Sequence, residues 1–274
     1  MRRLLINTLI FCACACSGQA LRFSEPTWDY TALPNASTTL LMHFENDYTD
    51  LGGGTWQNAA NGWNGFASDA YKFGSYSAYH QTAFNTIQHY FYSTTATEAV
   101  EVGAGDFTLE FWAGINVTTN SGSPSNDILS VSFITGAAGA YFRVYNTYSG
   151  ASYVPGLRFL DSGGTNFSGI YTGHGYFSGL NWFHCCFERR SGTLYGYVNG
   201  QQVMASAMAY EPVSITEVDV VAFNRTYLAA KFYIDELRVF KGDYVYGGEF
   251  TPPTRAIGLQ NPFKLSISGG EIKF

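Results

Sequence analysis

The residue whose placement most suggests chemistry is Asp235, an acid within the strand-like segment 232–240 (FYIDELRVF). Strict alternation would place it on one side of the strand with three apolar residues: Tyr233, Leu237 and Val239. A carboxylate on that side costs several kcal/mol unless it is paired. Asp235 is therefore predicted either to accept backbone amide hydrogen bonds that hold two strands in register, or to bind a metal.

Calcium is the metal that the nearby acids would suit. It takes six to eight oxygen ligands from carboxylates, backbone carbonyls and water. Glu45 and Asp50, in the first long loop of the chain, are the expected further ligands beside Asp235, and Asp47 is the alternative to Glu45. The amide alternative for Asp235 remains open at this point.

Aromatic residues next to amides suggest a second kind of site, one for a glycan. Trp56, Asn61 and Trp63 lie close together in the loop 56–66, where the indole faces could stack on sugar rings and the amide could bond to hydroxyls. The alternative is that both tryptophans fold down and fasten this glycine-rich loop to the core. Tyr148 is a further candidate, in a cluster that would equally suit a protein–protein surface (Tyr141, Tyr145, Tyr148, Tyr153).

Signatures of catalysis are weak, and we expect no enzyme. A glycan hydrolase needs two carboxylates that face one cleft. Glu217 and Asp219 are followed by apolar residues, and the adjacent Asp235 and Glu236 should point to opposite sides of their strand. Glu236 is instead expected to form a surface ion pair with Arg238, which would contribute little to stability. The five histidines show no spacing typical of metal ligands.

The elements that must position these residues are strands. Of the 274 residues 46% are hydrophobic and 17% aromatic, which is not the composition of a disordered chain. Only 13% are charged, and the net charge is −6. No basic run is long enough to hold phosphates, so we predict no nucleic-acid partner.

Short strands separated by turns account for most of the chain, and no long amphipathic helix is apparent. In 107–115 the apolar residues alternate most clearly, and Asn199-Gly200 is typical of a two-residue hairpin turn. The remaining expected strands are 39–44, 72–78, 127–134, 140–145, 156–160, 181–189, 193–198, 201–206, 218–223 and 232–240. Such a pattern predicts a two-sheet sandwich or jelly roll.

Four stretches in order resemble the laminin G-like family of concanavalin A-type sandwiches. They are 40–53, 105–115 (GDFTLEFWAGI), 182–201 (WFHCCFERRSGTLYGYVNGQ) and 233–254, which begins YIDELRVFKG and ends EFTPPT. The resemblance implies an all-β, concanavalin A-like jelly-roll β-sandwich of two antiparallel sheets over residues 39–254. Some members of that family bind calcium through acids at such places, which implies Ca²⁺ as a cofactor.

The two ends of the chain lie outside this expected domain. Residues 1–20 are either a leader-like segment, with Arg2 and Arg3 before a short apolar run, or an N-terminal arm, and 21–38 read as an extended linker. The apolar run is too short for a stable membrane span. The C-terminal extension 255–274 ends in KLSISGGEIKF, which alternates like a strand that could pair with a neighbour.

We therefore expect a non-catalytic binding or assembly module. The leading hypothesis is a phage virion surface protein, a tail fibre or decoration protein, that binds cell-surface glycans or other virion proteins. It is suggested by the family resemblance and by cysteine usage, since the only cysteines after residue 16, Cys185 and Cys186, are adjacent and a poor disulfide pair. Homo-oligomerisation through the termini is expected. The alternatives are a secreted, extracellular bacterial carbohydrate-binding protein and a glycan hydrolase.

Overall fold

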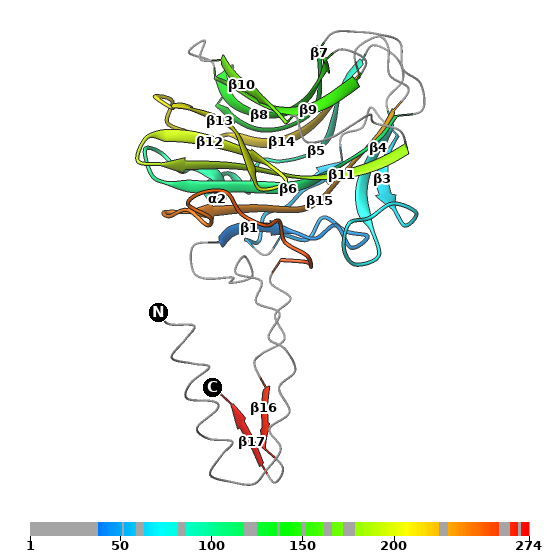
Figure 1. Ribbon diagram of the computed structural model, residues 1–274, viewed down its shortest axis with the longest axis vertical. Helices are drawn as coiled ribbons and strands as arrows, with labels where there is room; N and C mark the ends of the chain where they lie inside the picture. Colours follow the sequence, from blue (N-terminus) through cyan, green and yellow to red (C-terminus); the bar gives the residue numbers. More distant parts are fainter. Residues whose placement is uncertain are drawn as a thin grey trace. The chain divides into compact units, whose positions relative to one another are not determined.

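Two antiparallel β-sheets stack face to face in the structure, which is a computed structural model (Figure 1). It describes residues 38–50, 52–58, 63–81, 86–117, 125–135, 138–149, 152–161, 166–171, 179–224, 230–257, 264–267 and 270–273. The chain divides into two units: Pro34–Ile257, and Met1–Leu33 together with Gly258–Phe274. The sandwich that was expected over 39–254 lies in the first unit, and the buried Ile257 extends it by three residues.

Eight strands of the described chain form one sheet, in the order β13-β12-β11-β6-β15-β4-β3, with β1 also paired to β15. Every pairing is antiparallel. The strands are β1 (Thr38–Met42), β3 (Trp63–Ala67), β4 (Ser77–Gln81), β6 (Phe107–Val117), β11 (Gly179–Arg190), β12 (Thr193–Val198), β13 (Gln201–Ala207) and β15 (Ala230–Lys241).

Seven further described strands form the second antiparallel sheet, in the order β10-β9-β8-β7-β14-β5-β2. They are β2 (Gln57–Asn58), β5 (Thr86–Ser93), β7 (Ser125–Thr135), β8 (Ala138–Ser149), β9 (Ser152–Asp161), β10 (Asn166–Ile170) and β14 (Glu217–Asn224). In Figure 1 strands β8, β9 and β10 curve away from the eight-stranded sheet. The expected all-β sandwich of two antiparallel sheets is confirmed.

Aromatic side chains fill the space between the sheets. Phe142 on β8 lies at ring-centroid distances of 5.0 Å and 5.2 Å from Phe133 and Phe159 of its own sheet. It also contacts Phe107 and Phe187 of the eight-stranded sheet, at 5.9 Å and 5.2 Å. Tilted and edge-on contacts of this kind add to the free energy gained from burying apolar area. They join the two sheets into one core.

Two tight hairpins order the edge of the eight-stranded sheet, and the sequence predicted the one at Asn199-Gly200. Asn199 and Gly200 have φ values of 49° and 78°, and Ser191 and Gly192 have 48° and 80°. Positive φ at both central residues defines the type I′ turn, which matches the twist of the strands it joins. These turns fix the register of β11, β12 and β13.

Some local expectations were wrong. The segment 72–78 was expected to be a strand, but the strand there, β4, begins only at Ser77. The segment 56–66 was expected to be a loop, but it contains β2 and most of β3. The strand β5 (Thr86–Ser93) was missed. The edge strands β2 and β3, with two and five residues, carry too few alternating residues to stand out from loops.

One helical turn, α2 (Thr97–Val100), connects β5 to β6. Within the described ranges, no helix has the length and apolar character needed to cross a bilayer. In the second unit, β16 (Lys264–Ile267) and β17 (Gly270–Lys273) pair as an antiparallel hairpin. The alternating C-terminal segment therefore pairs with itself in the structure.

Candidate functional site

A β-bulge in β15 decides where Asp235 points. The pairing of β15 with β6 shifts register between Asp235 and Arg238, and Glu236 has a φ of 52°. The extra residue breaks the alternation. Leu237 and Val239 thus face the core, whereas Asp235 lies on the outer side of the sheet. The prediction that these three residues share one side is wrong for this reason.

Backbone amides surround the buried carboxylate of Asp235. Its Oδ2 accepts hydrogen bonds from the N–H groups of Lys72 and Phe73, at 2.9 Å and 3.1 Å. Its Oδ1 accepts one from Glu236, at 2.9 Å. Burial raises the pKa of the Asp235 carboxyl to about 8, although these donors favour its charged form. Asp235 therefore attaches the loop before β4 to β15, as the amide alternative predicted.

Asp50 is engaged in the same way. Its Oδ1 accepts from the amides of Gly52 and Leu41, at 2.8 Å and 3.3 Å. Its Oδ2 accepts from the amide of Gly54 at 3.3 Å and from the indole N–H of Trp56 at 3.5 Å. The carboxylate thus organises the turn that follows β1.

The residues predicted to bind calcium do not form the expected cage. Both carboxylate oxygens of Glu45 accept from the amide of Ser75, at 3.1 Å and 3.0 Å, and Asp47 accepts from Thr49 at 3.0 Å. In the part of the chain that is described, no three His, Cys, Asp or Glu side chains lie close enough together to hold a metal ion. Donor N–H groups occupy the oxygens that calcium would need. As its hydrogen bonds stand, this donor set does not fit calcium.

The residues predicted to bind a glycan are placed as follows. Trp56 is buried, with 8% of its surface exposed, and packs edge-on against Phe91 at 5.4 Å. It therefore fastens its loop to the core and offers no open ring face. Asn61 lies outside the described residues. Only the backbones of Trp63 in β3 and Tyr148 in β8 are described, so the role of these three residues stays a prediction.

On the outer side of the eight-stranded sheet, a buried polar network centres on Glu110. Arg238 forms an ion pair with its carboxylate, His184 Nε2 lies 3.1 Å from Oε2, and the Tyr246 hydroxyl donates to the same oxygen. Burial opposes ionisation, but Arg238 and these hydrogen bonds hold the pKa of Glu110 at about 2. The expected surface pair between Glu236 and Arg238 is wrong, because both are buried.

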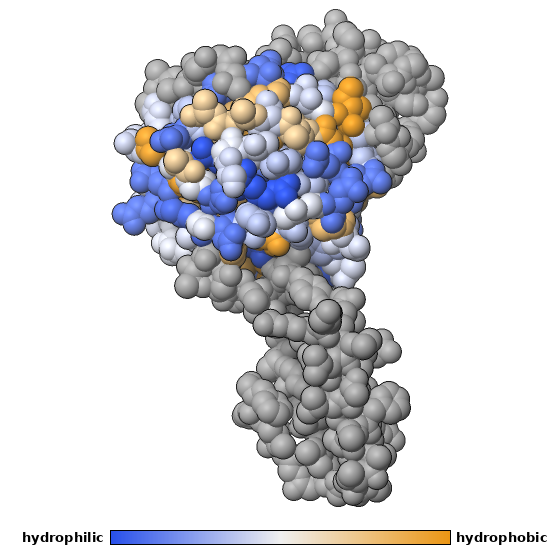
Figure 2. Space-filling view, turned by 60° about the vertical axis from the view of Figure 1, so that its left-hand side comes forward, coloured by the Kyte–Doolittle hydropathy of each residue, from blue (hydrophilic) through white to orange (hydrophobic). Residues whose placement is uncertain are grey.

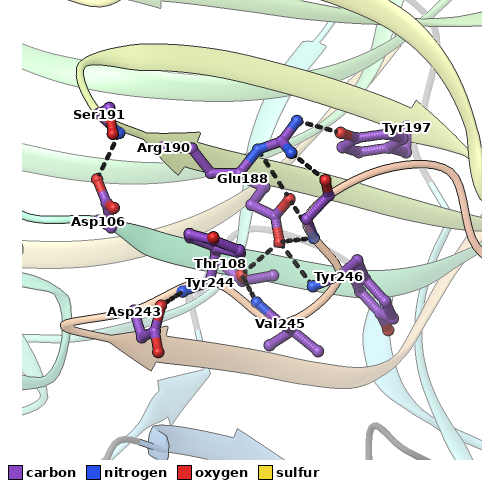
Figure 3. Close-up of polar contacts among 11 residues, drawn as sticks. Asp106, Thr108, Glu188, Arg190, Ser191, Tyr197, Asp243, Tyr244, Val245 and Tyr246 are labelled. Carbon is purple, nitrogen blue, oxygen red and sulfur yellow. Dashed lines mark hydrogen bonds and ion pairs between the residues drawn. The ribbon is translucent and has the colours of Figure 1, made fainter. Parts of the chain in front are cut away.

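A second carboxylate, Glu188, holds the segment that follows β15 (Figure 3). It accepts hydrogen bonds from the amides of Tyr246 at 2.8 Å and of Gly247 at 3.1 Å, and from the Thr108 hydroxyl at 3.4 Å. Arg190 Nε lies 3.3 Å from the same carboxylate. Burial raises the pKa of Glu188, and the hydrogen bonds and Arg190 oppose the shift. These contacts attach Tyr246 and Gly247, which follow β15, to strand β11.

The pair Glu110 and Glu188 is the arrangement nearest to that of a hydrolase. The two acids lie on neighbouring strands, since Cys186 is opposite Glu110 and Glu188 is opposite Thr108. Both side chains are fully buried, and both carboxylates accept hydrogen bonds from the segment that covers them. A sugar cannot reach acids in that position. The pair therefore stabilises the fold.

Polar and aromatic side chains line the outer side of the seven-stranded sheet, which we call the binding face. On β8 the residues Tyr141, Arg143 and Tyr145 point away from the core, because Phe142 and Val144 between them point into it. Tyr141 and Arg143 are half-buried, whereas Tyr145 is buried. Sequence reasoning singled out the tyrosines but missed Arg143. The available signal was the alternation of the segment YFRVY, in which every second residue shares one side.

The binding face extends over five strands. In register across β5, β14, β7, β8 and β9 lie Tyr92, Asp219, Ser132, Tyr141 and Leu160, of which Asp219 and Ser132 are buried and the other three are half-buried. Tyr92 also donates a hydrogen bond to Gln57 on β2, at 2.8 Å. Aromatic rings beside charged and hydroxyl groups are the lining expected where a protein binds a small polar ligand or another protein.

The described surface offers no competing apolar patch in the view of Figure 2, where apolar side chains form small separate spots. The exposed large hydrophobic residues are scattered over loops and strand ends (Tyr71, Ile170, Leu180, Val213, Tyr244). Single exposed apolar residues are normal on a folded protein. The polar, aromatic binding face is accordingly the better candidate site.

Comparisons with known proteins agree with the fold. A laminin G profile, described as the concanavalin A-like lectin/glucanases superfamily, matches residues 88–243. No curated protein matches the chain. Similar solved structures include one of botulinum neurotoxin type C, described in the words "Cell entry of botulinum neurotoxin type C is dependent upon interaction with two ganglioside molecules". That structure has a TM-score of 0.52 and 15% identity, and the match covers 77% of this chain and 49% of the toxin chain.

Two other solved structures show the same likeness. The binding domain of botulinum neurotoxin serotype D has a TM-score of 0.52 and 12% identity, and that of botulinum neurotoxin DC, in complex with rat synaptotagmin II, has 0.51 and 14%. Each match covers 76% of this chain and 48% of the toxin chain, so the chain spans about half the length of these proteins. The likeness establishes the fold. Because the profile covers more than half of the chain, the protein belongs to the concanavalin A-like lectin/glucanases superfamily, as a laminin G-type member.

Proposed function

We propose that the protein is a non-catalytic binding module that uses the outer side of its seven-stranded sheet to hold a glycan or a neighbouring protein. The observation that carries this proposal is the row of tyrosine and arginine side chains on β8 and β9, where Tyr141, Arg143 and Arg158 are only partly buried. Side chains of these types dominate the energetics of binding surfaces. The acids that could have served catalysis are used to anchor loops.

The fold supports this proposal in a general way. The type C toxin structure shares the sandwich at low identity, and cell entry of that toxin is described as dependent upon interaction with two ganglioside molecules. A fold hosts many functions, however, so the function of this chain depends on its own side chains. If the binding face holds the ligand, replacing Tyr141 or Arg158 should weaken ligand binding, whereas replacing Glu188 should not affect the contacts to the ligand.

We further propose that the protein acts on the surface of a phage virion, as a tail fibre or decoration protein. Cys185 and Cys186 are buried free thiols, so this part of the chain needs no oxidising compartment to fold. The hairpin of β16 and β17 supports assembly, because an isolated two-stranded hairpin is only marginally stable in water. A strand from a second copy or from another virion protein would extend this hairpin and stabilise it.

The alternative is a secreted bacterial carbohydrate-binding protein. Mass spectrometry of the mature N-terminus separates the two proposals. A chain that begins at Met1 supports the virion proposal, whereas one that begins at Leu21 supports secretion after removal of residues 1–20.

Binding itself is tested by screening the full chain against an array of neutral and acidic glycans. The control variant Glu98→Gln alters an exposed acid on the one-turn helix α2 and should bind like the wild type. Binding that Tyr141→Ala weakens about tenfold supports the proposal, since loss of one aromatic contact costs about 1–2 kcal/mol. Equal binding by the wild type and Tyr141→Ala would contradict it.

A further inference from the structure

A row of aromatic residues and glycines crosses the outer side of the eight-stranded sheet, on the opposite sheet from the binding face. In register across β11, β6, β15, β4 and β3 lie Trp182, Gly114, Tyr233, Tyr79 and Gly65. Their neighbours along the strands, such as Phe183 and Phe232, lie in the core, so the row faces outward. Tyr233 is buried, whereas Trp182 and Tyr79 are half-buried.

The indole ring of Trp182 lies flat on strand β6. A Cβ atom on Gly114 would lie 3.0 Å from each of three consecutive atoms of the six-membered ring, Cζ2, Cη2 and Cζ3. A point equally distant from three atoms of a planar hexagon lies on the axis through its centre. One face of the indole therefore covers the backbone at Gly114, where a side chain would crowd the ring, and the other face is directed away from the sheet.

The outward face of this indole keeps access to solvent in the part of the chain that is described. Trp182 contacts one other described ring, that of Tyr233, with the centroids 6.1 Å apart and the planes tilted by 45°, so Tyr233 lies beside it. Leu180, the preceding residue on the same side of β11, is 38% exposed. An aromatic face that is supported from below and open above is suited to stacking on the C–H face of a sugar ring.

Groups that hydrogen-bond hydroxyls surround the indole. Asn116 on β6 lies opposite Leu180 on β11 and Lys231 on β15, and both polar residues are half-buried. Asn116 also forms a hydrogen bond with Tyr233, whose pKa is raised to about 12 by burial and by the charge of Asp69, although this bond opposes the rise. Asp69 is exposed. An amide, an ammonium and a carboxylate thus lie around the ring, and the two charges balance.

We propose that the outer side of the eight-stranded sheet carries a second binding site, the Trp182 patch, which takes a neutral pyranose sugar stacked on the indole. The patch consists of Trp182, Leu180, Asn116, Lys231, Tyr79 and Asp69. Hydroxyl groups project from the rim of a pyranose, where the polar side chains of the patch supply partners. A stable protein partner would need about 800 Å² on this side, much more than one indole face and one leucine provide. The site goes beyond the proposed function, because it shares no residue with the binding face.

The test is a nuclear magnetic resonance titration of the full chain, labelled with nitrogen-15. Cellohexaose, mannotriose and lactose are the neutral probes, and an oligogalacturonate is the acidic comparison. The chain has five tryptophans, and the variant Trp182→Phe identifies which indole N–H signal belongs to Trp182. Trp182→Ala removes the ring, and Asp69→Asn changes an exposed acid without disturbing the core. Tyr244→Ala is the matched control, because it removes a ring that is 42% exposed and lies outside the patch.

We expect one neutral probe to shift the indole signal of Trp182 together with the amides at 114–116, 180–182 and 231–233. Trp182→Ala should weaken this binding about tenfold or more, and Asp69→Asn about threefold. Tyr244→Ala should bind within about twofold of the wild type. Melting temperatures establish that each variant is folded, and Trp182→Phe and Asp69→Asn decide the test if Trp182→Ala does not fold.

Four results would overturn the inference. If the folded ring variants bind as well as the wild type, or if the shifts are confined to 141–145 and 156–160, the Trp182 patch is wrong and the binding face stands. If the oligogalacturonate binds the patch more tightly than every neutral probe, the neutral ligand is wrong. If dilution of the protein alone shifts the same signals, a second copy of the chain covers the patch. If no probe shifts them, the inference fails, whereas the proposed function is still decided by the array and Tyr141→Ala.

Discussion

Replacing Glu110 by glutamine tests the buried network most sharply. The change keeps the shape of the side chain but leaves the guanidinium of Arg238 buried without its countercharge, at 1% exposure. Removing one partner of a buried ion pair costs about 3–5 kcal/mol, because the remaining charge stays desolvated. Glutamine can still bond to Tyr246, so we expect a loss at the lower end of that range, about 3 kcal/mol.

The double variant Glu110→Gln/Arg238→Met separates the ion pair from its surroundings. Methionine fills most of the space of the arginine without a charge, so the second change should recover much of the loss. The expected coupling energy between the two sites is at least about 2 kcal/mol, well above the roughly 0.5 kcal/mol that independent sites show.

Urea unfolding followed by circular dichroism measures all four proteins of this cycle. Glu98→Gln on α2 is the control, because an exposed acid should alter the unfolding free energy by less than about 0.5 kcal/mol. A loss below about 1 kcal/mol for Glu110→Gln, or additive effects in the double variant, would refute the reasoning that the network stabilises the fold.

The remaining predictions concern three other anchoring contacts. Truncation after Ile257 should leave the melting temperature of the sandwich unchanged. Truncation after Thr254 should lower the free energy of unfolding by about 2 kcal/mol, because it removes the buried Ile257, whose amide donates a hydrogen bond to Glu236 at 2.7 Å. Equal melting curves of the two truncated proteins would contradict this. Because the folded-state pKa of Asp235 is raised to about 8, the folded protein holds a proton that the unfolded chain loses above about pH 4, so this contribution to stability falls as pH rises from 4 to 8. Asp235→Asn should flatten that slope in urea titrations at several pH values, and an unchanged slope would show that burial does not raise this pKa. Finally, calcium in place of EDTA should not shift the melting temperature, because Glu45, Asp50 and Asp235 bond to backbone amides; a clear upward shift would mean that calcium binds.

Much of the fold followed from local patterns. The alternation along β6 placed Phe107, Leu109 and Phe111 in the core, where the structure has them. The pair Asn199-Gly200 identified a hairpin turn from its need for positive φ. Both signals are carried by adjacent residues, so no knowledge of distant partners was needed.

The bulge in β15 could not be read in the same way. Glu236 adopts a positive φ although nothing in its residue type favours that conformation. Contacts from far along the chain stabilise it there, since its carboxylate bonds to His43 at 2.8 Å and to the amide of Ile257 at 2.7 Å. The alternation argument therefore failed at the residue where tertiary contacts overrode local preference.

Only part of the candidate site could be predicted from the sequence, for a related reason. Tyr141 and Tyr145 were recognised as an aromatic cluster, but the pairing of Arg143 with Arg158 depends on the register of β8 and β9, which the sequence does not state. Asp50 and Asp235 were singled out as candidate calcium ligands, but in the structure most of their partners are backbone amides, which every residue type except proline supplies. Composition alone cannot distinguish such donors from a metal.

The most direct test of the binding face is amide chemical-shift mapping. The full chain, labelled with nitrogen-15, is titrated with the tightest glycan from the array, and perturbed residues are mapped onto the two sheets. The binding face predicts that the largest shifts cluster at 141–145 on β8 and 156–160 on β9. Shifts confined to β11 and β12 of the eight-stranded sheet, near the Glu188 network, would contradict the account.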